Sequence, residues 1–555
     1  MATIISSEKE RRNLHPNEIA KNKEDIQLIW LDQHIDDSGD CQYTQSLLIE
    51  LNPAAQFYSD VNRCLDLIKS IKDEFVFLII SGAVAREILP KISTYRSIVA
   101  IFIFCSSRNR QYHVHLLKKY DKIVDIFTDQ DALVESIQKI MNLIEKQILA
   151  FNLFDQKQKL GKDLSKESAS FILNQMLIYV LKQMPQDQQS KYDMLRVCTD
   201  YYRDNSEQLT KIDQFRKEYT ADQAVQWYTD ECFLYKLLNK ALRTEDLGLL
   251  YIFRFFVIDL CAAIETDNLR LREKSVLTLF RGANIPNEEL EKLERNKGQV
   301  ISTNGFLSTS RSIEVSLRFI KQTPTANNDR PVLFEIEADP TLKSVTFADI
   351  EHKTRNEDEE EVLFNLNTLF EIGSVNFDSR LNLWKIKLIT TDRGSEMIQE
   401  YLTSVKKHLD DYPPIIYFGQ FLLNEMGQVD QAGKYFQLLL DSLPPDHENI
   451  ADVYSNLGNV HSERNELNLA LKNYELAYTI RQKLLSSDHP HVASSLQNIG
   501  TIYKHKGCLD QALHYCQQAL TIFEKNYPND HVNKAINMEY IGRIYTDKDD
   551  FDTAL

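Results

Sequence analysis

Three short segments between residues 279 and 364 decide how the middle of this 555-residue chain is interpreted. They are Leu279-Phe280-Arg281-Gly282, Phe306-Leu307-Ser308-Thr309-Ser310 and Glu359-Glu360-Glu361-Val362-Leu363-Phe364. Each lies beside a short apolar run, which is typical of a β-strand. In this order they predict one pocket that contains an arginine, a hydroxyl group and a pair of carboxylates.

The three segments belong to a central domain that the pattern places at residues 200–392. Its first part is helical by periodicity, with amphipathic helices around Trp227 and from Tyr235 to Arg243, and a more buried helix over Ile252–Ile264. From Val276 the pattern becomes strand-like, which predicts an α+β domain with a mostly antiparallel sheet. The expected strands are Val276–Phe280, Gly305–Ser308, Val332–Glu337, Ser344–Phe347, Glu361–Phe364, Thr368–Val375 and Leu383–Ile389.

The pattern of the N-terminal part predicts a doubly wound α/β domain over residues 25–150, which follows a disordered leader at residues 1–24. Apolar strands alternate with helical stretches, and this alternation indicates a parallel sheet buried on both faces. The expected strands are Ile26–Leu31, Phe75–Ile80, Ile98–Cys105 and Ile123–Phe127, and the expected helices are Ala55–Ile71, Tyr112–Tyr120 and Ala132–Ala150. A helical linker over residues 151–199 then leads to the central domain.

The role predicted for the α/β domain is protein interaction or regulation. It resembles bacterial receiver domains and the Toll/interleukin-receptor domain, both of flavodoxin-like fold, but it has no glycine-rich phosphate loop. Cys105, followed by Arg108, suggests a phosphatase loop, but the spacing to a second basic residue is wrong.

The last third, residues 393–555, is a repeat array. Gly458, Gly500 and Gly542 recur every 42 residues, as do Ala470, Ala512 and Ala554 and the Asp-His pairs that contain His447, His489 and His531. This pattern describes antiparallel helix pairs with small residues where they cross. The histidines are interpreted as helix-entry residues and not as metal ligands. Because the sequence stops at Leu555 within a second helix, we expect it to be a piece of a longer protein.

Composition and charge exclude several classes. The net charge of −17 argues against general nucleic-acid binding, which requires a basic surface. Eight scattered cysteines without a CxxC pair argue against structural zinc and a disulfide scaffold. The N-terminus lacks a signal peptide pattern, and apolar runs such as Ile98–Cys105 fall well short of the roughly 18–20 residues of a membrane span. These features predict a cytoplasmic protein without a membrane partner.

The residue types in the central pocket suit the cleavage of the nicotinamide–ribose bond of NAD. That reaction develops positive charge on the ribose, so a carboxylate is needed beneath the ring. Arg281 suits a phosphate or ribose because its guanidinium binds oxygen pairs, and Gly282 allows the backbone to approach the nicotinamide carboxamide. Ser308 is able to fix a carboxylate rotamer. Glu359 shares the face of Glu361 if the strand extends that far.

Simpler interpretations exist for each segment taken alone. Arg-Gly after a strand is a common turn, Ser-Thr-Ser is a frequent strand end, and the run Glu357–Glu361 is most often a solvated acidic loop. Three functions therefore stay open: transfer of ADP-ribose to arginine, hydrolysis of NAD with water as the acceptor, and a non-catalytic scaffold whose repeats carry the function.

The order of the segments resembles the R–S–E signature of arginine-specific mono-ADP-ribosyltransferases over about residues 200–392. This resemblance implies that Glu361 acts on the ribose 2′-hydroxyl, that Glu359 favours arginine as the acceptor, and that Ser308 supports Glu361. It also implies that Arg281 and Gly282 hold the dinucleotide.

The same resemblance implies a role for Phe319, which would stack on nicotinamide. NAD is then the co-substrate, no metal is required, and proteins with exposed arginines are the substrates. The repeats resemble the tetratricopeptide units of kinesin light chain, which implies peptide or protein partners.

Overall fold

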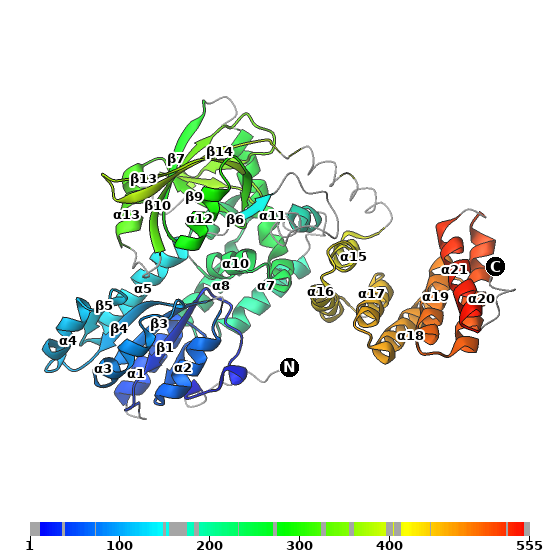
Figure 1. Ribbon diagram of the computed structural model, residues 1–555, viewed down its shortest axis with the longest axis horizontal. Helices are drawn as coiled ribbons and strands as arrows, with labels where there is room; N and C mark the ends of the chain where they lie inside the picture. Colours follow the sequence, from blue (N-terminus) through cyan, green and yellow to red (C-terminus); the bar gives the residue numbers. More distant parts are fainter. Residues whose placement is uncertain are drawn as a thin grey trace. The chain divides into compact units, whose positions relative to one another are not determined.

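The computed structural model describes residues 11–35, 39–72, 74–147, 151–154, 175–182, 188–230, 232–269, 275–322, 329–353, 360–393, 395, 403, 412–444, 446–528 and 531–548. Its chain forms two compact units. The first contains both the N-terminal sheet and the central sheet, and the second contains the repeat helices after Glu400. Figure 1 shows the three kinds of architecture that the sequence predicts: an α/β domain, an α+β domain and an all-α array.

The N-terminal domain has a parallel sheet of five strands in the described part of the chain, in the order β2-β1-β3-β4-β5. The strands are β1 (Ile26–Leu31), β2 (Gln56–Tyr58), β3 (Phe75–Ser81), β4 (Ile98–Phe104) and β5 (Ile123–Phe127). The helices are α1 (Gly39–Leu51), α2 (Val61–Ser70), α3 (Gly82–Ile92), α4 (Arg110–Leu117) and α5 (Gln130–Gln147). This strand order is that of the flavodoxin-like doubly wound fold.

The two faces of this sheet are covered by different helices. Residues of α2, α3 and α4 pack on the side chains of Ile29 and Leu31, whereas residues of α1 and α5 pack on those of Leu28 and Trp30. Because successive side chains of a strand point to opposite faces, β1 contributes residues to the apolar cluster on each face of the sheet. The four strands expected from the sequence are therefore confirmed as a sheet buried on both sides.

Two details of the N-terminal prediction are corrected. The expected helix Ala55–Ile71 begins with strand β2, because the buried triplet Gln56–Tyr58 pairs with β1 before Asp60 caps α2. Helices α1 and α3 also lie between the strands, where the sequence pattern indicates helical stretches without bounds for these two. The expected disordered leader is corrected for residues 11–24: Asn13 donates its backbone N–H to the Phe57 carbonyl, and the short helix η2 (Pro16–Glu18) follows.

The central domain consists of a helical lobe and a mixed sheet. The described strands are β6 (Phe151–Phe154), β7 (Leu277–Pro286), β8 (Val300–Thr303), β9 (Leu307–Ser310), β10 (Asp329–Ala338), β11 (Phe347–Asp349), β12 (Glu361–Phe364), β13 (Leu369–Asp378) and β14 (Leu383–Thr390). They lie in the order β11-β12-β9-β7-β10-β14-β13-β8-β6. The pairs are antiparallel except for β10 with β14, which is parallel.

The helices of the central domain are α7 (Gln188–Tyr201), α8 (Ser206–Glu218), η3 (Ala221–Gln223), α9 (Ala224–Thr229), α10 (Phe233–Arg243), α11 (Leu247–Leu269), α12 (Asn287–Arg295), α13 (Ile313–Gln322) and η4 (Glu351–Lys353). The domain has helices that pack around one apolar helix, α11, and others, α12 and α13, that pack on the sheet. Strands β6 and β8 were not expected. Because β6 pairs with β8, the segment expected to be a helical linker over residues 151–199 begins with a strand of the central sheet.

Helix α11 corrects the expectation that apolar runs fall far short of a membrane span. Among the described residues, Leu247–Asn268 is long and apolar enough by length and composition to cross a membrane, with a mean hydropathy of 2.1. In this fold 61% of that window is buried, against α7, α9, α10 and β11. A helix that is apolar on most sides is typical of the centre of a helical lobe.

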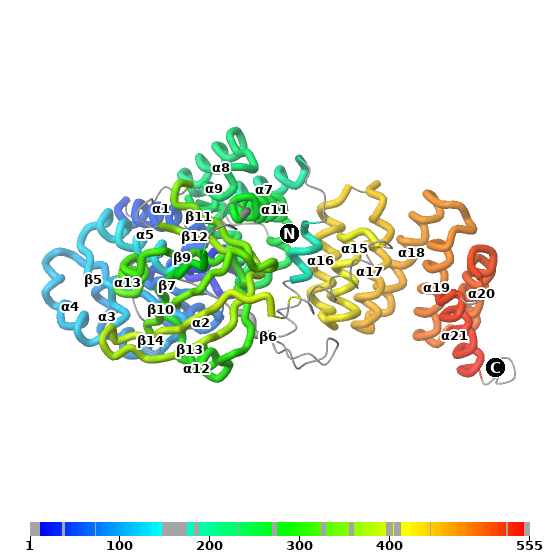
Figure 2. The backbone as a smooth tube through the Cα atoms, turned by 90° about the horizontal axis from the view of Figure 1, so that it is seen from above, coloured from blue at the N-terminus to red at the C-terminus, as the bar shows by residue number. Residues whose placement is uncertain are grey.

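The second unit is an array of helix pairs, which Figure 2 shows as successive hairpins. Its described helices are α15 (Pro414–Gln420), η6 (Phe421–Glu425), α16 (Val429–Ser442), α17 (Ile450–Glu463), α18 (Leu467–Leu484), α19 (Pro490–His505), α20 (Leu509–Asn526) and α21 (Val532–Asp547). The expected small residues are confirmed at two crossings: a Cβ on Gly458 would lie 2.5 Å from the Tyr474 ring, and one on Gly500 would lie 2.6 Å from Cys516 Sγ. Ala554 lies outside the described residues.

The repeated histidines are confirmed as helix-entry residues. The imidazoles of His489 and His531 accept hydrogen bonds from the backbone N–H groups of His491 and Asn533, at the starts of α19 and α21. His447 Nδ1 accepts in the same way from the N–H of Asn449, at 3.2 Å. These bonds satisfy donors that a helix leaves without an intrahelical partner.

Candidate active site

Arg281 lies on β7, a central strand whose opposite face, with Phe280 and Gly282, packs against α13. Its guanidinium makes two main-chain contacts: Nη1 donates to the Ser308 carbonyl at 2.6 Å, and Nη2 donates to the Lys146 carbonyl. Burial lowers the pKa of Arg281, while Tyr235, Tyr228 and Glu361 oppose that shift. An arginine remains charged at neutral pH even when its pKa is lowered, so the site holds a buried cation.

Ser308 and Glu361 lie on the neighbouring strands β9 and β12. The two strands are antiparallel, with Leu363 opposite Ser308 and Glu361 opposite Ser310. This diagonal arrangement places the two side chains on one face, where Ser308 Oγ donates to Glu361 Oε1 at 2.5 Å. Thr309 Oγ1 donates to the Val362 carbonyl at 2.8 Å and ties the same strands together. The rotamer of the Glu361 carboxylate is therefore held by a hydroxyl donor.

The structure brings the arginine, the serine and the glutamate into one hydrogen-bonded chain. Arg281 binds the main chain of Ser308, and Ser308 binds the carboxylate of Glu361 through its side chain. These residues are 27 and 53 positions apart in sequence. The guanidinium Nε is buried and has no hydrogen-bond partner among the described residues, so its N–H is one donor of this cation that is left for another acceptor.

Gly282 has a packing role on α13, and the approach of its backbone to the nicotinamide carboxamide stays a prediction. A Cβ at this position would lie 2.0 Å from the Ser316 carbonyl oxygen and 2.8 Å from Ile320 Cγ1, both on α13. Backbone atoms do not give way as a flexible side chain does, so only glycine allows α13 to lie this close to β7. The space beside the Gly282 α-carbon is filled by a helix and not by a substrate.

Glu359 lies outside the described residues, so its place relative to Glu361 stays a prediction. In the described part of the chain, strand β12 begins at Glu361, and Glu360 has a φ of 44°. This left-handed conformation is uncommon for a residue other than glycine.

Phe319 contacts the N-terminal domain. Its ring packs against the apolar cluster of that domain that includes Leu133, Ile137 and Ile144 of α5. The Lys146 ammonium lies 5.5 Å from the ring centroid. The ring is half-buried, and its stacking on nicotinamide stays a prediction.

An aromatic group beside the three polar residues was not predicted from the sequence. Tyr228 on α9 lies 5.3 Å from Tyr235 on α10 and 5.2 Å from Phe306, measured between ring centroids. Its hydroxyl donates to Asn239 Oδ1 at 2.8 Å. Burial raises the pKa of Tyr228, against the effect of Asn239, and Glu361 raises it further. The only sequence signal was that these tyrosines lie in the two amphipathic helices before the first strand.

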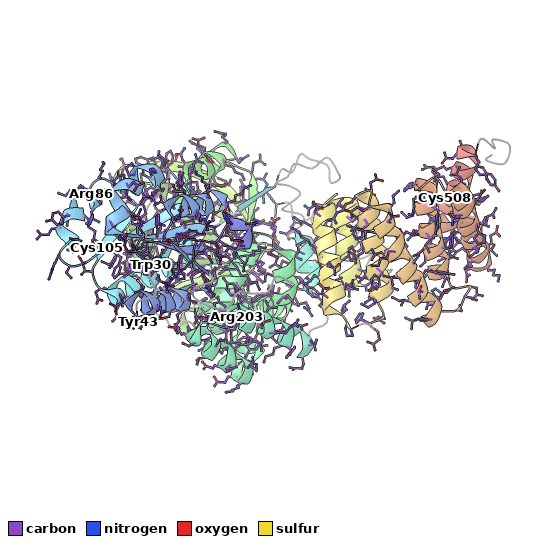
Figure 3. All side chains as sticks on the ribbon, turned by 90° about the horizontal axis from the view of Figure 1, so that it is seen from below. Trp30, Tyr43, Arg86, Cys105, Arg203 and Cys508 are labelled. Atoms are coloured by element: carbon purple, nitrogen blue, oxygen red, sulfur yellow. The ribbon has the colours of Figure 1, made fainter. Side chains whose placement is uncertain are left out.

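In the N-terminal domain, the candidate nucleophile at the end of a strand is Cys105. Cys105, labelled in Figure 3 with Arg86, follows β4. Burial raises the pKa of the Cys105 thiol, and Arg110 opposes this shift only in part. A thiol with a raised pKa is a poor nucleophile at neutral pH.

The comparisons with known proteins define the class of the central and C-terminal parts. The family model described as NAD:arginine ADP-ribosyltransferase matches residues 174–396, and that of the tetratricopeptide repeat matches residues 417–483, 450–507 and 491–555. The chain therefore combines an ADP-ribosyltransferase domain with C-terminal tetratricopeptide repeats. Members of the transferase family use NAD as a substrate and act on proteins. No curated protein matches this sequence.

Solved structures with local similarity fall into the same two groups. Exoenzyme S from Pseudomonas aeruginosa is 20% identical to this chain. The match covers 31% of this chain and 75% of exoenzyme S, with a TM-score of 0.24. The C3 exoenzyme of Clostridium limosum is 16% identical, with coverages of 32% and 87% and a TM-score of 0.24.

BtubC from P. vanneervenii represents the repeat group. It is 20% identical, and the match covers 25% of this chain and 57% of BtubC, with a TM-score of 0.24. This chain thus spans less than two thirds of the length of BtubC. Because all these scores are low, the assignment of both domains rests on the family models.

Proposed function

We propose that this protein transfers ADP-ribose from NAD to arginine side chains of target proteins and releases nicotinamide. The single observation that carries the proposal is the hydrogen-bonded chain from Arg281 through Ser308 to Glu361, inside a domain of this transferase family. A cation for the dinucleotide and a fixed carboxylate for the ribose are the two groups that the reaction needs from the protein.

The reaction breaks the bond between ribose C1′ and the nicotinamide nitrogen. The bonding electron pair leaves with nicotinamide, which becomes neutral, and positive charge develops on the ribose. The carboxylate of Glu361, held by Ser308 Oγ, stabilises that charge beneath the sugar. A guanidine nitrogen of the acceptor then attacks C1′ and loses a proton, so the products are nicotinamide, a proton and the ADP-ribosylated arginine.

Arg281 serves the same reaction by binding the dinucleotide. Its two terminal nitrogens already donate to main-chain carbonyls, and its buried Nε retains a hydrogen for a phosphate or ribose oxygen. A charge-assisted hydrogen bond in a buried site is stronger than a neutral one. The aromatic side chains of Tyr228, Tyr235 and Phe306 supply apolar surface beside these groups.

Hydrolysis of NAD, with water as the acceptor, is the second candidate. It would use the same cation and the same fixed carboxylate, Arg281 and Glu361, with water in place of the guanidinium. Recruitment of target proteins by the repeats belongs to the transferase proposal, because tetratricopeptide repeats generally mediate protein interactions.

The experiment that tests these candidates supplies NAD with agmatine as an arginine mimic and measures free nicotinamide and the ADP-ribosyl adduct. Adduct formation supports the transferase, nicotinamide without adduct supports hydrolysis, and neither product supports a scaffold. Glu361→Gln keeps the shape but removes the negative charge, so both products should fall by about 100-fold or more. Glu351→Gln, on the nearby helix η4, is the matched control and should retain activity.

A further inference from the structure

Helix α5 of the N-terminal domain ends against the transferase site. It runs from Gln130 to Gln147 and contacts both β7 and α13 of the central domain. Figure 1 shows α5 between the N-terminal sheet and the central sheet, which belong to one compact unit. The last turn of this helix therefore lies beside Arg281 and Gly282 of β7 and Phe319 of α13.

Two residues of this turn make three specific contacts. The Lys146 carbonyl accepts a hydrogen bond from Arg281 Nη2, and the Lys146 ammonium lies 5.5 Å from the Phe319 ring centroid. Glu145 forms an ion pair with Lys236 of α10 at 3.5 Å, with side-chain exposures of only 5% and 6%. Burial acts to lower the pKa of Lys236, but Glu145 and Glu24 outweigh it and raise that pKa.

We propose that the last turn of α5 is a positioning element of the transferase site. The Lys146 carbonyl and the Ser308 carbonyl together fix the plane of the Arg281 guanidinium, and the Glu145–Lys236 ion pair holds the turn in place. NAD binding thus depends on the N-terminal α/β domain. This inference rests on the proposed function, because it assigns a role in binding the substrate of that site.

Helix geometry explains why this turn suits the task. The last four carbonyls of an α-helix have no intrahelical partner, and they carry the negative end of the helix dipole. A guanidinium is the complementary group, since its donors are planar and fixed relative to one another. With one carbonyl on each terminal nitrogen, the side chain has little freedom to rotate. The remaining Nε–H is then held in one direction, without a partner among the described residues.

The surrounding contacts indicate a permanent arrangement and not a removable inhibitor. Lys240 of the helical lobe donates to the carbonyls of Asn22 and Glu24 at 3.0 and 2.6 Å and pairs with Glu74 at 2.9 Å. Arg243 pairs with Asp25. These polar groups are buried or half-buried and are satisfied across the contact, so separation of the two domains would break several charge-assisted bonds at once.

The test measures NAD kinetics of the full chain with agmatine as the acceptor. Glu145→Gln removes the charge that holds the turn, and we expect KM for NAD to rise about 10-fold while kcat stays within about two-fold, because only binding is loosened. Lys236→Met should act in the same way, and Lys236→Arg, which keeps the ion pair, should retain the KM of the wild type. Glu74→Gln is the matched control: it breaks a pair in the same interface without touching the α5 turn, and it should leave KM unchanged.

If the last turn of α5 had a purely structural role, Glu145→Gln would lower the thermal midpoint of unfolding and the amount of active protein. It would not raise KM while leaving kcat unchanged. If Glu145→Gln destabilises the fold, the double variant Glu145→Gln with Lys236→Met removes both buried charges and avoids an unpaired ion. An unchanged KM in the folded single and double variants would overturn the proposal. A wild-type protein that forms neither nicotinamide nor adduct would instead remove the proposed function, and this inference with it.

Discussion

At the scale of single residues, the site separates two tasks of Ser308. Its carbonyl accepts from Arg281, whereas its hydroxyl donates to Glu361. The first contact belongs to the main chain and survives any substitution of the side chain. The second depends on the hydroxyl alone. In the proposed mechanism, binding of the dinucleotide and stabilisation of the ribose cation are therefore connected through one residue but carried by different atoms.

Ser308→Ala tests this separation. Without the hydroxyl, the Glu361 carboxylate loses its donor and its fixed rotamer, so kcat should fall by about 10- to 100-fold. KM for NAD should change by less than about three-fold, because the Arg281 contact with the main chain remains. Steady-state kinetics with NAD and agmatine measure both values. A rise in KM with kcat unchanged would contradict the assignment.

At the scale of elements, the site depends on how closely α13 lies on β7. Gly282 has no space for a side chain because the Ser316 carbonyl of α13 lies where its Cβ would be. The same close approach brings Phe319 of α13 to the cluster around α5. A glycine chosen for helix packing thus determines the relation between three elements that surround Arg281.

Gly282→Ala should destabilise the first compact unit by about 3 kcal/mol or more, because the new methyl group meets backbone and not a flexible side chain. Gly305→Ala is the matched control, since a Cβ at that position has no atom within 4 Å. Urea unfolding at neutral pH compares the two variants. Equal stability of both variants would show that α13 moves away from β7 at little cost.

At the scale of the whole molecule, the ADP-ribosyltransferase domain and the repeats belong to separate compact units. Gly458 lies at a helix crossing of the repeats, where a side chain would meet the Tyr474 ring at 2.5 Å. Gly458→Val should therefore disturb the packing of α17 on α18. Transfer to agmatine should stay within about two-fold of the wild type, because the transferase site has its own core.

Transfer to a protein target should fall in the same variant if the repeats recruit that target. The measurement compares ADP-ribosylation of agmatine with that of proteins in a cell extract, each with labelled NAD. The wild type serves as the reference for both acceptors, and circular dichroism checks that the repeats lose only local packing. An equal loss with both acceptors would contradict independent units, and no loss with either would argue against recruitment.

Much of this architecture could be predicted because its signals are local. The buried strands of the N-terminal sheet are continuous apolar runs, and the repeats have a constant period. Strands β2 and β8 were missed because β2 has only three residues and β8, Val300–Thr303, combines apolar and small polar residues that also suit a loop. Their structure comes from pairing with β1 and β13, which no local pattern encodes.

The sequence by itself determined the three architectures and the candidate residues Arg281, Ser308 and Glu361, because residue type and spacing carry that information. Only the tertiary structure decided how these residues meet: Ser308 is linked to Glu361 by the register of β9 with β12, and Arg281 is linked to Lys146 by the packing of a helix from another domain. Such contacts join positions up to 135 residues apart. They depend on how whole elements pack, and that packing is set by all their side chains together.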